Sequence, residues 1–291
     1  MNHERLIVPP GKTIKLKEYD PAYTGKFSSK EDAAEKLESD IAALAALQDV
    51  LYAQNSFSLL LIFQAMDAAG KDGVIKHVMS GVNPQGCQVV SFKTPSAEEL
   101  AHDYLWRSMK QVPERGRIGI FNRSYYEEVL VVRVHPEILG SQKIPRELVT
   151  KDIWKERFEQ INAYERYLSR NGTVILKFFL NVSNGEQKKR FLERIDTPAK
   201  NWKFSPADVR ERAHWKEYMN AFEEVFNNTS TKWAPWHIIP ADHKWFTRAA
   251  VADVIVSALK SLDLHYPVPD AEHRKSLKEA RKTLEDDHSS T

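Results

Sequence analysis

The residues best suited to do chemistry lie between Leu59 and Gly73, in the stretch Leu-Leu-Leu-Ile-Phe-Gln-Ala-Met-Asp-Ala-Ala-Gly-Lys-Asp-Gly. An apolar run that predicts a buried strand ends at small residues, passes Gly70-Lys71 and continues into a helical pattern near Val74. In such an arrangement, backbone N–H groups and a helix N-terminus surround an anion while a lysine reaches its oxygens. The stretch therefore predicts a phosphate-binding loop.

The loop departs from the general pattern G-x-x-x-x-G-K-[ST] at two positions. Ala65 replaces the first glycine, which is tolerated only where no positive φ is needed, and Asp72 replaces the hydroxyl residue that usually binds magnesium. The strand before the loop and the helix after it supply the context that the motif requires. The predicted phosphate contacts in this region are Ala68, Ala69, Gly70, Lys71, Asp72, Gly73 and Lys76.

Three side chains are predicted to carry out phosphoryl transfer, which needs aligned reactants and neutralised charge more than a covalent catalyst. Lys71 supplies a point charge. Asp67 is a candidate magnesium ligand because Mg²⁺ takes one or two carboxylates together with phosphate oxygens. Arg123 directly follows an apolar run, where a guanidinium can bind two phosphate oxygens. The ordinary alternatives are an exposed lysine at a helix start, a turn-shaping aspartate and a structural ion pair.

Positive charge is concentrated in one segment of the chain. The formal net charge is only +2, but residues 188–216 contain nine basic and four acidic side chains, so the rest of the chain is negative. A concentrated positive field beside a phosphate loop predicts a polyanionic substrate, and a solvated helix face is the ordinary alternative. The candidate cations of a lid or channel, one of them before this segment, are Arg133, Arg194, Lys203 and Arg212.

The composition excludes several classes of protein. A hydrophobic fraction of 42% with 28% charged residues is ordinary for a globular domain. The longest aliphatic run, Leu59 to Phe63, is too short to cross a bilayer, and no apolar segment typical of a secretory signal follows the first residues. The single cysteine, Cys87, excludes an intramolecular disulfide and reads as a packed strand residue. We therefore expect a cytoplasmic protein without membrane contact.

No linker rich in Pro, Gly or Ser divides the 291 residues, so we predict one large domain with an inserted flap. The predicted parts are an N-terminal arm over residues 1–27, the domain over residues 28–270 and a charged tail over residues 271–291.

Apolar and amphipathic segments alternate along the domain. Strands are expected at residues 59–63, 88–92, 118–121, 173–180 and 236–240, and helices directly after the loop and at residues 28–53, 96–109, 147–168, 186–195 and 247–262. A plausible capping box, Ser28-Ser-Lys-Glu31, begins the first of these helices. Strands that alternate with helices predict an α/β fold with a parallel sheet covered on both faces, whose ligands lie at the carboxyl ends of the strands.

Several further motifs accompany the loop. They are Asn83-Pro-Gln-Gly86, Phe121-Asn122-Arg123-Ser124-x-Tyr126-Glu127, Arg133-Val-His135-Pro136, Asn201-Trp202-Lys203-Phe204 and Arg212-Ala-His214-Trp215. Together with Met66–Gly73, they make the chain closely resemble the polyphosphate kinase 2 family from about Ser28 to Leu264. Linked motifs in the right order are far more specific than any one of them.

The resemblance implies magnesium-dependent, reversible phosphoryl transfer from inorganic polyphosphate to AMP and ADP, with Mn²⁺ as an alternative metal. It implies a P-loop kinase-like parallel sheet flanked by helices, with a helical lid at about residues 125–170. The implied ligands are polyphosphate, AMP, ADP and ATP, with guanine nucleotides as further acceptors. It also implies a homodimer or homotetramer. The residues themselves lead us to expect neither nucleic acid nor a membrane as a partner.

The second motif departs from the commonest family pattern. Many members read Asp-Arg-Ser-x-Tyr-Asn there, whereas this chain has neutral Asn122 at the strand end and Glu127 in the helix that follows. This arrangement resembles the subgroup that accepts both nucleoside monophosphates and diphosphates. On this basis Asn122, Tyr126 and Glu127 are assigned to acceptor selection, and Glu127 joins Asp67 as a metal ligand.

Two other functions stay open at this point. An ATP-dependent nucleotide kinase would use the same loop and differ in its phosphate donor. A polyanion-binding or RNA-binding module would use residues 188–216 without catalysis, although the chain has no RNP-type aromatic pattern and the loop would then have no role.

Overall fold

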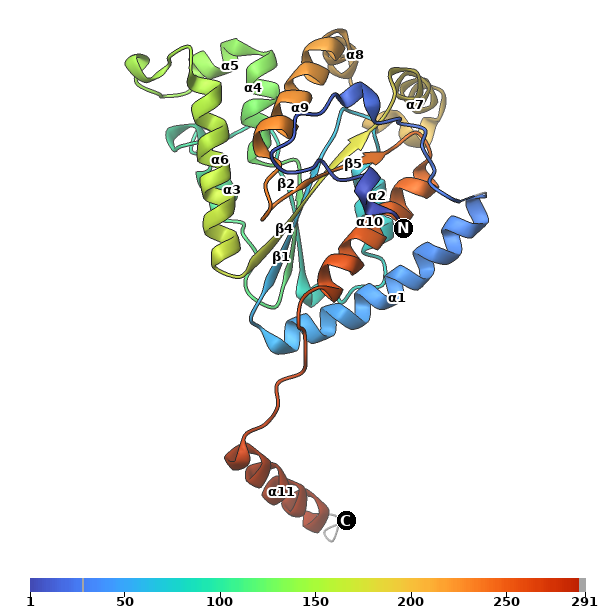
Figure 1. Cartoon of the computed structure of the whole chain (residues 1–291), viewed down its shortest axis with the longest axis vertical. Coiled ribbons are helices and arrows are strands. Elements are labelled where there is room, and N and C mark those ends of the chain that lie inside the picture. Colours follow the sequence, from blue (N-terminus) through green and yellow to red (C-terminus); the bar gives the residue numbers. More distant parts are fainter. Residues whose placement is uncertain (28, 288–291) are drawn as a thin grey trace.

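A five-stranded parallel sheet forms the centre of the molecule in the computed structural model, which describes residues 1–27 and 29–287 (Figure 1). The strands are β1 (Ser58–Gln64), β2 (Cys87–Ser91), β3 (Ile118–Asn122), β4 (Thr173–Asn181) and β5 (Trp236–Pro240), in the spatial order β2-β3-β1-β4-β5. Helices cover both faces. The predicted α/β class is therefore confirmed.

The central strand β1 explains where a ligand can bind. All seven of its residues are buried, as expected for a strand that is paired on both sides and covered on both faces. Leu61 is aligned with Ile120 of β3 on one side and with Leu176 of β4 on the other. Because the chain leaves β1 toward one edge of the sheet and later returns to the other, a crevice opens at its carboxyl end, where ligands bind in such sheets.

One face of the sheet is covered by α1 (Lys30–Gln54) and α10 (Lys244–Lys260), with α2 (Lys71–Val78) beside α10. The hydroxyl of Ser29 caps α1 by accepting a hydrogen bond from the backbone N–H of Asp32 at 3.1 Å. The expected capping box began one residue earlier, at Ser28, which lies outside the described residues.

The other helices include α6 (Ile153–Arg170), which packs against β4 and α9 (Trp215–Thr229) on the opposite face. Shorter helices connect the layers: α3 (Trp106–Met109), α4 (Val131–Val134), α5 (Pro136–Ser141), α7 (Asn184–Asp196) and α8 (Pro206–Ala213). The predicted lid of about residues 125–170 thus contains α4 and α5 and also the sheet-packed α6. Its limits stay a prediction.

The helix expected at residues 96–109 is wrong for most of its length. Only Trp106–Met109 is α-helical, after a short 3₁₀ turn at Glu99–Ala101. The side chain of Asp103 accepts a hydrogen bond from the backbone N–H of Leu105 at 2.9 Å and so begins a new turn. A local bond of this kind competes with a continuous helix.

The N-terminal arm is part of the core. The backbone N–H of Val8 donates to the carbonyl of Trp236 at 2.8 Å, and that of Ile238 donates to Leu6 at 2.7 Å. Leu6 and Val8 are fully buried. The arm thereby covers the outer edge of β5, which would otherwise present unpaired backbone groups.

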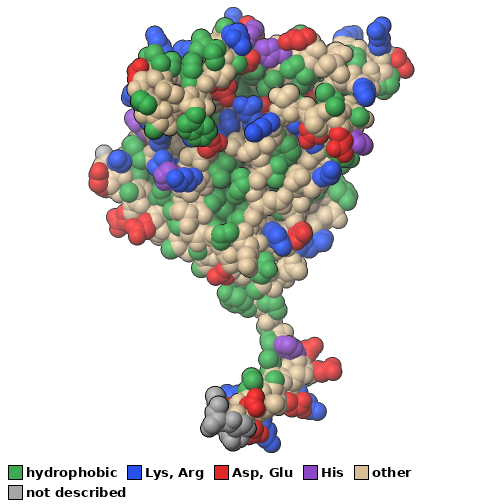
Figure 2. All heavy atoms as spheres, turned by 180° about the vertical axis from the view of Figure 1, so that it is seen from behind, with side chains coloured by type: hydrophobic (Ala, Val, Ile, Leu, Met, Phe, Trp, Pro, Cys, Tyr) green, Lys and Arg blue, Asp and Glu red, His purple; other side chains and the backbone are tan. Residues whose placement is uncertain are grey.

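The last described helix, α11 (Ala271–Asp286), projects away from the body of the molecule (Figure 1). All of its residues are exposed, and both signs of charge lie along it (Figure 2). The sequence prediction that covers this segment is a charged tail over residues 271–291. Among the described residues, no helix has both the length and the apolar character needed to span a bilayer.

A cluster of charges joins the arm and two helices and gives a test of stability. Asp253 of α10 lies 2.5 Å from Nζ of Lys36 in α1 and 2.5 Å from Nε2 of His3. Burial alone would raise the pKa of the Asp253 carboxyl, but the hydrogen bonds from His3 and Lys36 outweigh it and hold the pKa well below its ordinary value. The ionised carboxylate therefore stabilises the fold above the unfolded pKa of about 3.9, and this contribution is lost as the pH falls toward the folded pKa.

We predict that Asp253→Asn lowers the free energy of unfolding at pH 7 by about 1–3 kcal/mol, because the amide loses the charged bonds. The deficit should shrink in acid, because below about pH 3.9 the unfolded wild-type chain takes up a proton at this carboxyl and the ionised native form loses part of its advantage. Urea unfolding of both proteins at pH 7 and at about pH 3 measures this, since the ordinary pKa of the group lies between these values. Asp49→Asn is the control because Asp49 is exposed on α1. A deficit that is the same at both pH values would contradict the assignment.

Candidate active site

The loop between β1 and α2 has the backbone shape of an anion site. Ala68 and Gly70 both have positive φ, 62° and 110°, and α2 begins at Lys71 without a side-chain cap on its N–H groups. A positive φ is easy for glycine and strained for alanine. The loop therefore presents a helix N-terminus whose first N–H groups have no side-chain cap among the described residues, as anion binding requires.

Side chains of α7 hold the loop from behind. Arg190 Nη1 donates to the carbonyls of Ala68 at 3.2 Å and Ala69 at 2.8 Å, and Gln187 Nε2 donates to the carbonyl of Asp67 at 3.0 Å. Three consecutive carbonyls thus point toward α7. The loop conformation is fixed from this side, away from the anion position.

Arg190 is tied down at its other nitrogens as well. Nη2 donates to the carbonyls of Ala241 at 2.6 Å and Asp242 at 3.1 Å, after β5, and Nε donates to Glu186 at 2.9 Å. The residue is 4% exposed, so its guanidinium interacts with protein groups rather than with a ligand or solvent. Of the nine basic residues of segment 188–216, this one serves the fold of the loop.

Lys71 lies at the start of α2 with its Nζ 3.1 Å from the carbonyl oxygen of Ala65. Burial lowers the pKa of the Lys71 ammonium, and the nearby charge of Arg123 lowers it further, while Asp67, Glu127 and Asp72 act against the shift. A phosphate group at the loop would favour the charged form of Lys71 in the same way as these carboxylates.

Arg123 connects the loop to the end of β3. Its Nη2 lies 2.9 Å from Asp67 Oδ1, and its Nη1 lies 3.6 Å from Glu127 Oε2. The charge of Glu127 raises the pKa of the guanidinium, burial opposes the rise, and Asp67 adds to it. Arg123 also has a positive φ of 63°, while its backbone N–H donates to the carbonyl of Phe63 in β1. The side chain is therefore aimed across the crevice by a strained turn.

Two further hydrogen bonds cross the same crevice. Asn122 Nδ2 donates to Asp72 Oδ1 at 2.8 Å, and Gln64 Nε2 donates to Glu127 Oε1 at 2.9 Å. Asn122 and the β1 residue Phe63 are aligned in the sheet, so the two strand ends lie together.

The acidic residues fit a metal only in part. Asp67 and Glu127 both contact Arg123, so two carboxylates converge on one place. Within residues 1–27 and 29–287, no group of three or more His, Cys, Asp and Glu side chains could hold a metal ion. Two carboxylates are the number that Mg²⁺ takes when phosphate oxygens and water complete its shell, so the donor set fits a metal that arrives with phosphate.

A cavity of about 760 Å³ opens beside this cluster. It reaches Arg123 and Glu127 at one end and is lined further on by Phe92, Tyr104 and Arg107. Burial lowers the pKa of Arg107, and the charges of Glu99, Glu127 and Glu128 oppose that shift. The volume and the aromatic lining are those of a small-molecule site.

The structure brings six of the predicted residues together and places others elsewhere. Asp67, Lys71, Asp72, Asn122, Arg123 and Glu127 surround the crevice. Arg212 reaches the loop indirectly, because its Nη1 donates to Gln187 Oε1 at 2.6 Å and Gln187 holds Asp67.

The other predicted cations contact different partners. Arg133 pairs with Glu224 at 2.6 Å, and Arg194 lies 3.6 Å from Asp208. Lys203 lies over the ring of Trp202, which is 78% exposed. Lys76 is exposed on α2.

Tyr126 requires a correction. The sequence assigns it to acceptor selection, but its side chain is fully buried and its hydroxyl donates to Glu165 at 2.7 Å. A ring packed in the core does not touch a ligand in the crevice. The neighbouring Asn122 and Glu127 do face the crevice.

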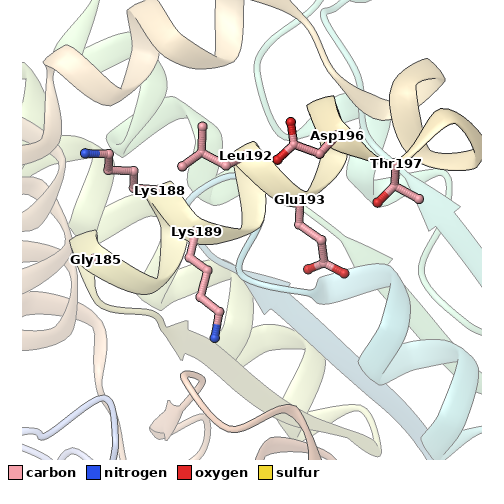
Figure 3. Close-up of a pocket in the computed structure, with 7 residues that line it drawn as sticks. All are labelled: Gly185, Lys188, Lys189, Leu192, Glu193, Asp196 and Thr197. Carbon is pink, nitrogen blue, oxygen red and sulfur yellow. The ribbon is translucent and has the colours of Figure 1, made fainter.

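The basic segment distributes its charge over several faces. A shallow hollow of about 480 Å³ runs along the outer face of α7, and all seven lining residues belong to α7 or its C-cap (Figure 3). Lys188 and Lys189 line it together with Glu193 and Asp196. Lys and Arg side chains gather in the upper half of the face shown in Figure 2. The hollow itself carries both signs of charge and lies apart from the loop residues.

Sequence reasoning missed four residues that shape the site: Gln64, Arg107, Gln187 and Arg190. Gln187 and Arg190 lie three positions apart on a predicted basic helix, and their burial on its inner face could have been found from that spacing. Gln64 is the last polar residue of a buried strand, directly before the loop. Nothing in the sequence distinguishes Arg107 from an ordinary exposed arginine.

These features together define a phosphotransferase site of the P-loop kinase class. The profile of the family described as Polyphosphate kinase 2 (PPK2) matches residues 27–266. The solved structure of polyphosphate kinase 2 from Arthrobacter aurescens superimposes with a TM-score of 0.83 and 41% identity, covering 92% of this chain and 93% of that chain. The chain belongs to the polyphosphate kinase 2 family and is an enzyme.

Two curated relatives cover nearly the whole chain. The ADP-polyphosphate phosphotransferase of Rhodopseudomonas palustris is 51% identical over 282 residues, which are 97% of this chain and 98% of the relative. The AMP/ADP-polyphosphate phosphotransferase of Meiothermus ruber is 43% identical over 273 residues, or 94% and 98% of the two chains. The family predicted from the linked motifs is thus confirmed.

The support of the loop by Arg190 can be tested through ligand binding. Lysine keeps the charge but cannot span carbonyls on two sides, so Arg190→Lys should weaken the binding of pyrophosphate by about tenfold, as loss of an outer partner does at other anion or metal sites. Isothermal titration calorimetry measures the affinity. Arg170→Lys is the matched control, because this arginine is exposed in the last turn of α6 and lies outside the proposed site. Equal affinities in the two variants would remove Arg190 from this role.

Proposed function

We propose that this protein transfers a phosphoryl group reversibly from inorganic polyphosphate to nucleoside mono- and diphosphates, converting AMP to ADP and ADP to ATP. The observation that carries the proposal is the meeting of Lys71 and Arg123 with the carboxylates of Asp67 and Glu127 at the end of β1. The names of the relatives from Rhodopseudomonas palustris and Meiothermus ruber support the choice of polyphosphate as donor and of ADP and AMP as acceptors.

The residues act mainly through charge and position. Lys71 and the N–H groups of α2 bind the phosphates of one substrate. Arg123 neutralises the charge on the oxygens of the phosphoryl group that is transferred. The acceptor phosphate is already ionised at neutral pH, so no general base is needed. Arg123 is paired with Asp67 and Glu127, so phosphate oxygens would compete with these carboxylates for its guanidinium.

Asp67 and Glu127 are the residues that would hold Mg²⁺, or Mn²⁺ in its place. The metal, when bound, supplies further neutralisation of phosphate charge. The chain's own part is to hold both carboxylates at one guanidinium, Asp67 at Nη2 and Glu127 at Nη1, so that the two candidate ligands lie together in the crevice.

The cavity beside Arg123 suits the nucleoside of the acceptor. Its volume of about 760 Å³ is sufficient for a drug-sized ligand, and Phe92 and Tyr104 offer apolar surface to a base. Adenine and guanine nucleotides are both proposed as occupants. The polyphosphate chain would then approach from the other side of the loop, where Arg194, Lys203 and Arg212 lie in and around α8.

One experiment decides between the donors. Purified protein, magnesium, polyphosphate and ADP are incubated without ATP, and the nucleotides are separated over time. Formation of ATP supports the proposal. Transfer from ATP to AMP, with none from polyphosphate, would show an ATP-dependent kinase instead, and binding without turnover would show a polyanion-binding protein.

In the same assay, Lys71→Ala should lower the rate by at least about a hundredfold, because it removes a preorganised charge from the transferring phosphates. Lys155→Ala is the control, since this lysine is 76% exposed on α6. The melting temperature of each variant shows that the fold is intact. A near-normal kcat in Lys71→Ala would exclude Lys71 from the site.

The choice between AMP and ADP should depend on where the crevice carries its negative charge. Asn122→Asp places a second carboxylate against Asp72, 2.8 Å from the present amide nitrogen, and Glu127→Asn removes a partner of Arg123. The double variant should change the ratio of the AMP and ADP rates by about tenfold, equivalent to about 1.4 kcal/mol of differential transition-state binding. Separate initial rates with each acceptor measure the ratio. If both rates change by one factor, these residues do not set acceptor choice.

A further inference from the structure

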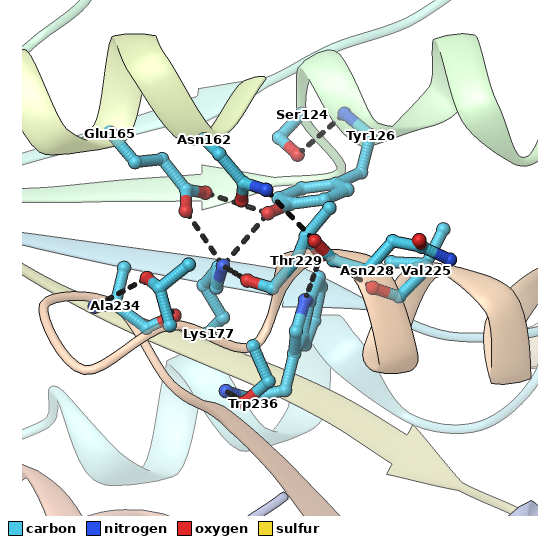
Figure 4. A network of polar contacts seen from close by, with 12 residues as sticks. Ser124, Tyr126, Asn162, Glu165, Lys177, Val225, Asn228, Thr229, Ala234 and Trp236 are labelled. Carbon is cyan, nitrogen blue, oxygen red and sulfur yellow. Dashed lines mark hydrogen bonds and ion pairs between the residues drawn. The ribbon is translucent and has the colours of Figure 1, made fainter. Parts of the chain in front are cut away.

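A buried ion pair lies beneath the crevice, in a part of the structure that the proposed reaction does not use. Lys177 in β4 is fully buried, and its Nζ bonds to Glu165 Oε2 at 2.7 Å, to the hydroxyl of Tyr126 at 2.8 Å and to the carbonyl of Thr229 at 2.7 Å (Figure 4). An ammonium has three donors, and all three are used. Burial lowers the pKa of Lys177, and the charge of Glu165 opposes the shift.

The carboxylate of Glu165 binds two consecutive tyrosines. Its Oε1 accepts hydrogen bonds from the hydroxyl of Tyr125 at 2.9 Å and from that of Tyr126 at 2.7 Å. Glu165 belongs to α6, which is packed on the sheet. The two tyrosines are therefore attached to a rigid layer of the fold.

The same two tyrosines begin the 3₁₀ helix Tyr125–Val129, which directly follows Arg123 and Ser124 and contains Glu127. On another side of this helix, Glu128 accepts hydrogen bonds from Arg157 Nε at 3.0 Å and Gln142 Nε2 at 2.8 Å. Residues 125, 126 and 128 are thus held by the interior, and Glu127 lies between them and reaches toward Arg123.

From these contacts we propose that Glu165 and Lys177 are positioning residues, which act through Tyr125 and Tyr126 to aim Arg123 and Glu127 at the phosphate-binding loop. The inference rests on the proposed phosphoryl transfer, because Arg123 and Glu127 are assigned to it. The residues themselves do not touch substrate.

Two physical arguments favour a positioning role over simple stabilisation. Desolvating a buried ion pair costs about as much as the pair gains, so apolar side chains of similar volume would serve the core equally well. The directional bonds of Glu165 and Lys177 instead define one orientation for two hydroxyl groups. In addition, the positive φ of Arg123, 63°, persists only if the surrounding structure enforces it, and the turn that follows is the part that is bonded to Glu165.

Tyr164 provides a comparison within the same region. Its ring packs against that of Tyr125 with centroids 5.6 Å apart, but its buried hydroxyl has no hydrogen-bond partner among the described residues. Tyr164→Phe therefore removes a hydroxyl from the same neighbourhood without breaking a bond to Glu165. It is the matched control for Tyr125→Phe and Tyr126→Phe.

The test measures kcat and the magnesium concentration for half-maximal rate with polyphosphate and ADP. Tyr126→Phe and Tyr125→Phe should each lower kcat or raise the magnesium requirement by about tenfold, the usual effect of losing an outer partner, while Tyr164→Phe should change both by less than about twofold. If Tyr125→Phe and Tyr126→Phe have lower melting temperatures but wild-type kcat and magnesium dependence, the network is only structural and the inference is wrong. A wild type that makes no ATP overturns the proposed function and this inference with it.

Hydrogen exchange of the free protein gives a second readout that needs neither metal nor turnover. Exchange at residues 125–129 should be faster in Tyr125→Phe and Tyr126→Phe than in wild type, and unchanged in Tyr164→Phe. Tyr125→Phe leaves all three bonds of Lys177 in place, so it carries the test if Tyr126→Phe does not fold. If the exchange rates at residues 125–129 are the same in Tyr125→Phe and Tyr126→Phe as in Tyr164→Phe, the proposal is wrong.

Discussion

The hydrogen bonds from α7 to the carbonyls of the phosphate-binding loop are the interaction on which the site depends. A loop that presents N–H groups to an anion must turn carbonyl oxygens away from it, and buried carbonyls need donors. Arg190 and Gln187 supply those donors to Asp67, Ala68 and Ala69. Because Arg190 also binds the chain after β5, the loop, α7 and the far strand are held as one unit. The buried charge of Arg190 thereby fixes the shape of a loop that is suited to bind an anion.

The cations and carboxylates of the crevice neutralise one another. Arg123 pairs with Asp67 and Glu127, and Lys71 bonds to a backbone carbonyl. Such pairing holds the charged side chains in fixed positions in the crevice. Under the proposed function, these side chains would need little rearrangement to bind phosphate and metal. The same logic explains why Asn122 faces Asp72: a neutral amide donates where a second carboxylate would repel. The charge at the strand ends is thereby balanced within the protein.

Beneath the crevice, the buried network of Lys177 and Glu165 differs from an ordinary core. Its polar groups are matched in number, since three donors of Lys177 meet three acceptors and both tyrosine hydroxyls meet Glu165. A network of this kind tolerates one geometry and penalises the others. Side-chain hydrogen bonds thus connect the rigid sheet to the turn that follows Arg123. This connection explains how the strained backbone conformation of Arg123 is maintained next to solvent.

Local sequence determined the strands, most helices and the loop, because these features depend on periodicity and on short motifs whose backbone context can be read directly. It also singled out Asp67, Lys71, Arg123 and Glu127, which the structure brings together at the crevice. The region 96–109 was predicted as one helix, and only tertiary contacts and the local bond of Asp103 decided otherwise. The sequence assigns Tyr126 to acceptor selection but does not show that its ring is buried. It places Gln187 and Arg190 on a basic helix but does not show that they support the loop. The direction in which a side chain points depends on which elements pack against it, and that is a property of residues distant in sequence, such as Glu165 and Lys177 beneath the turn at residues 125–129.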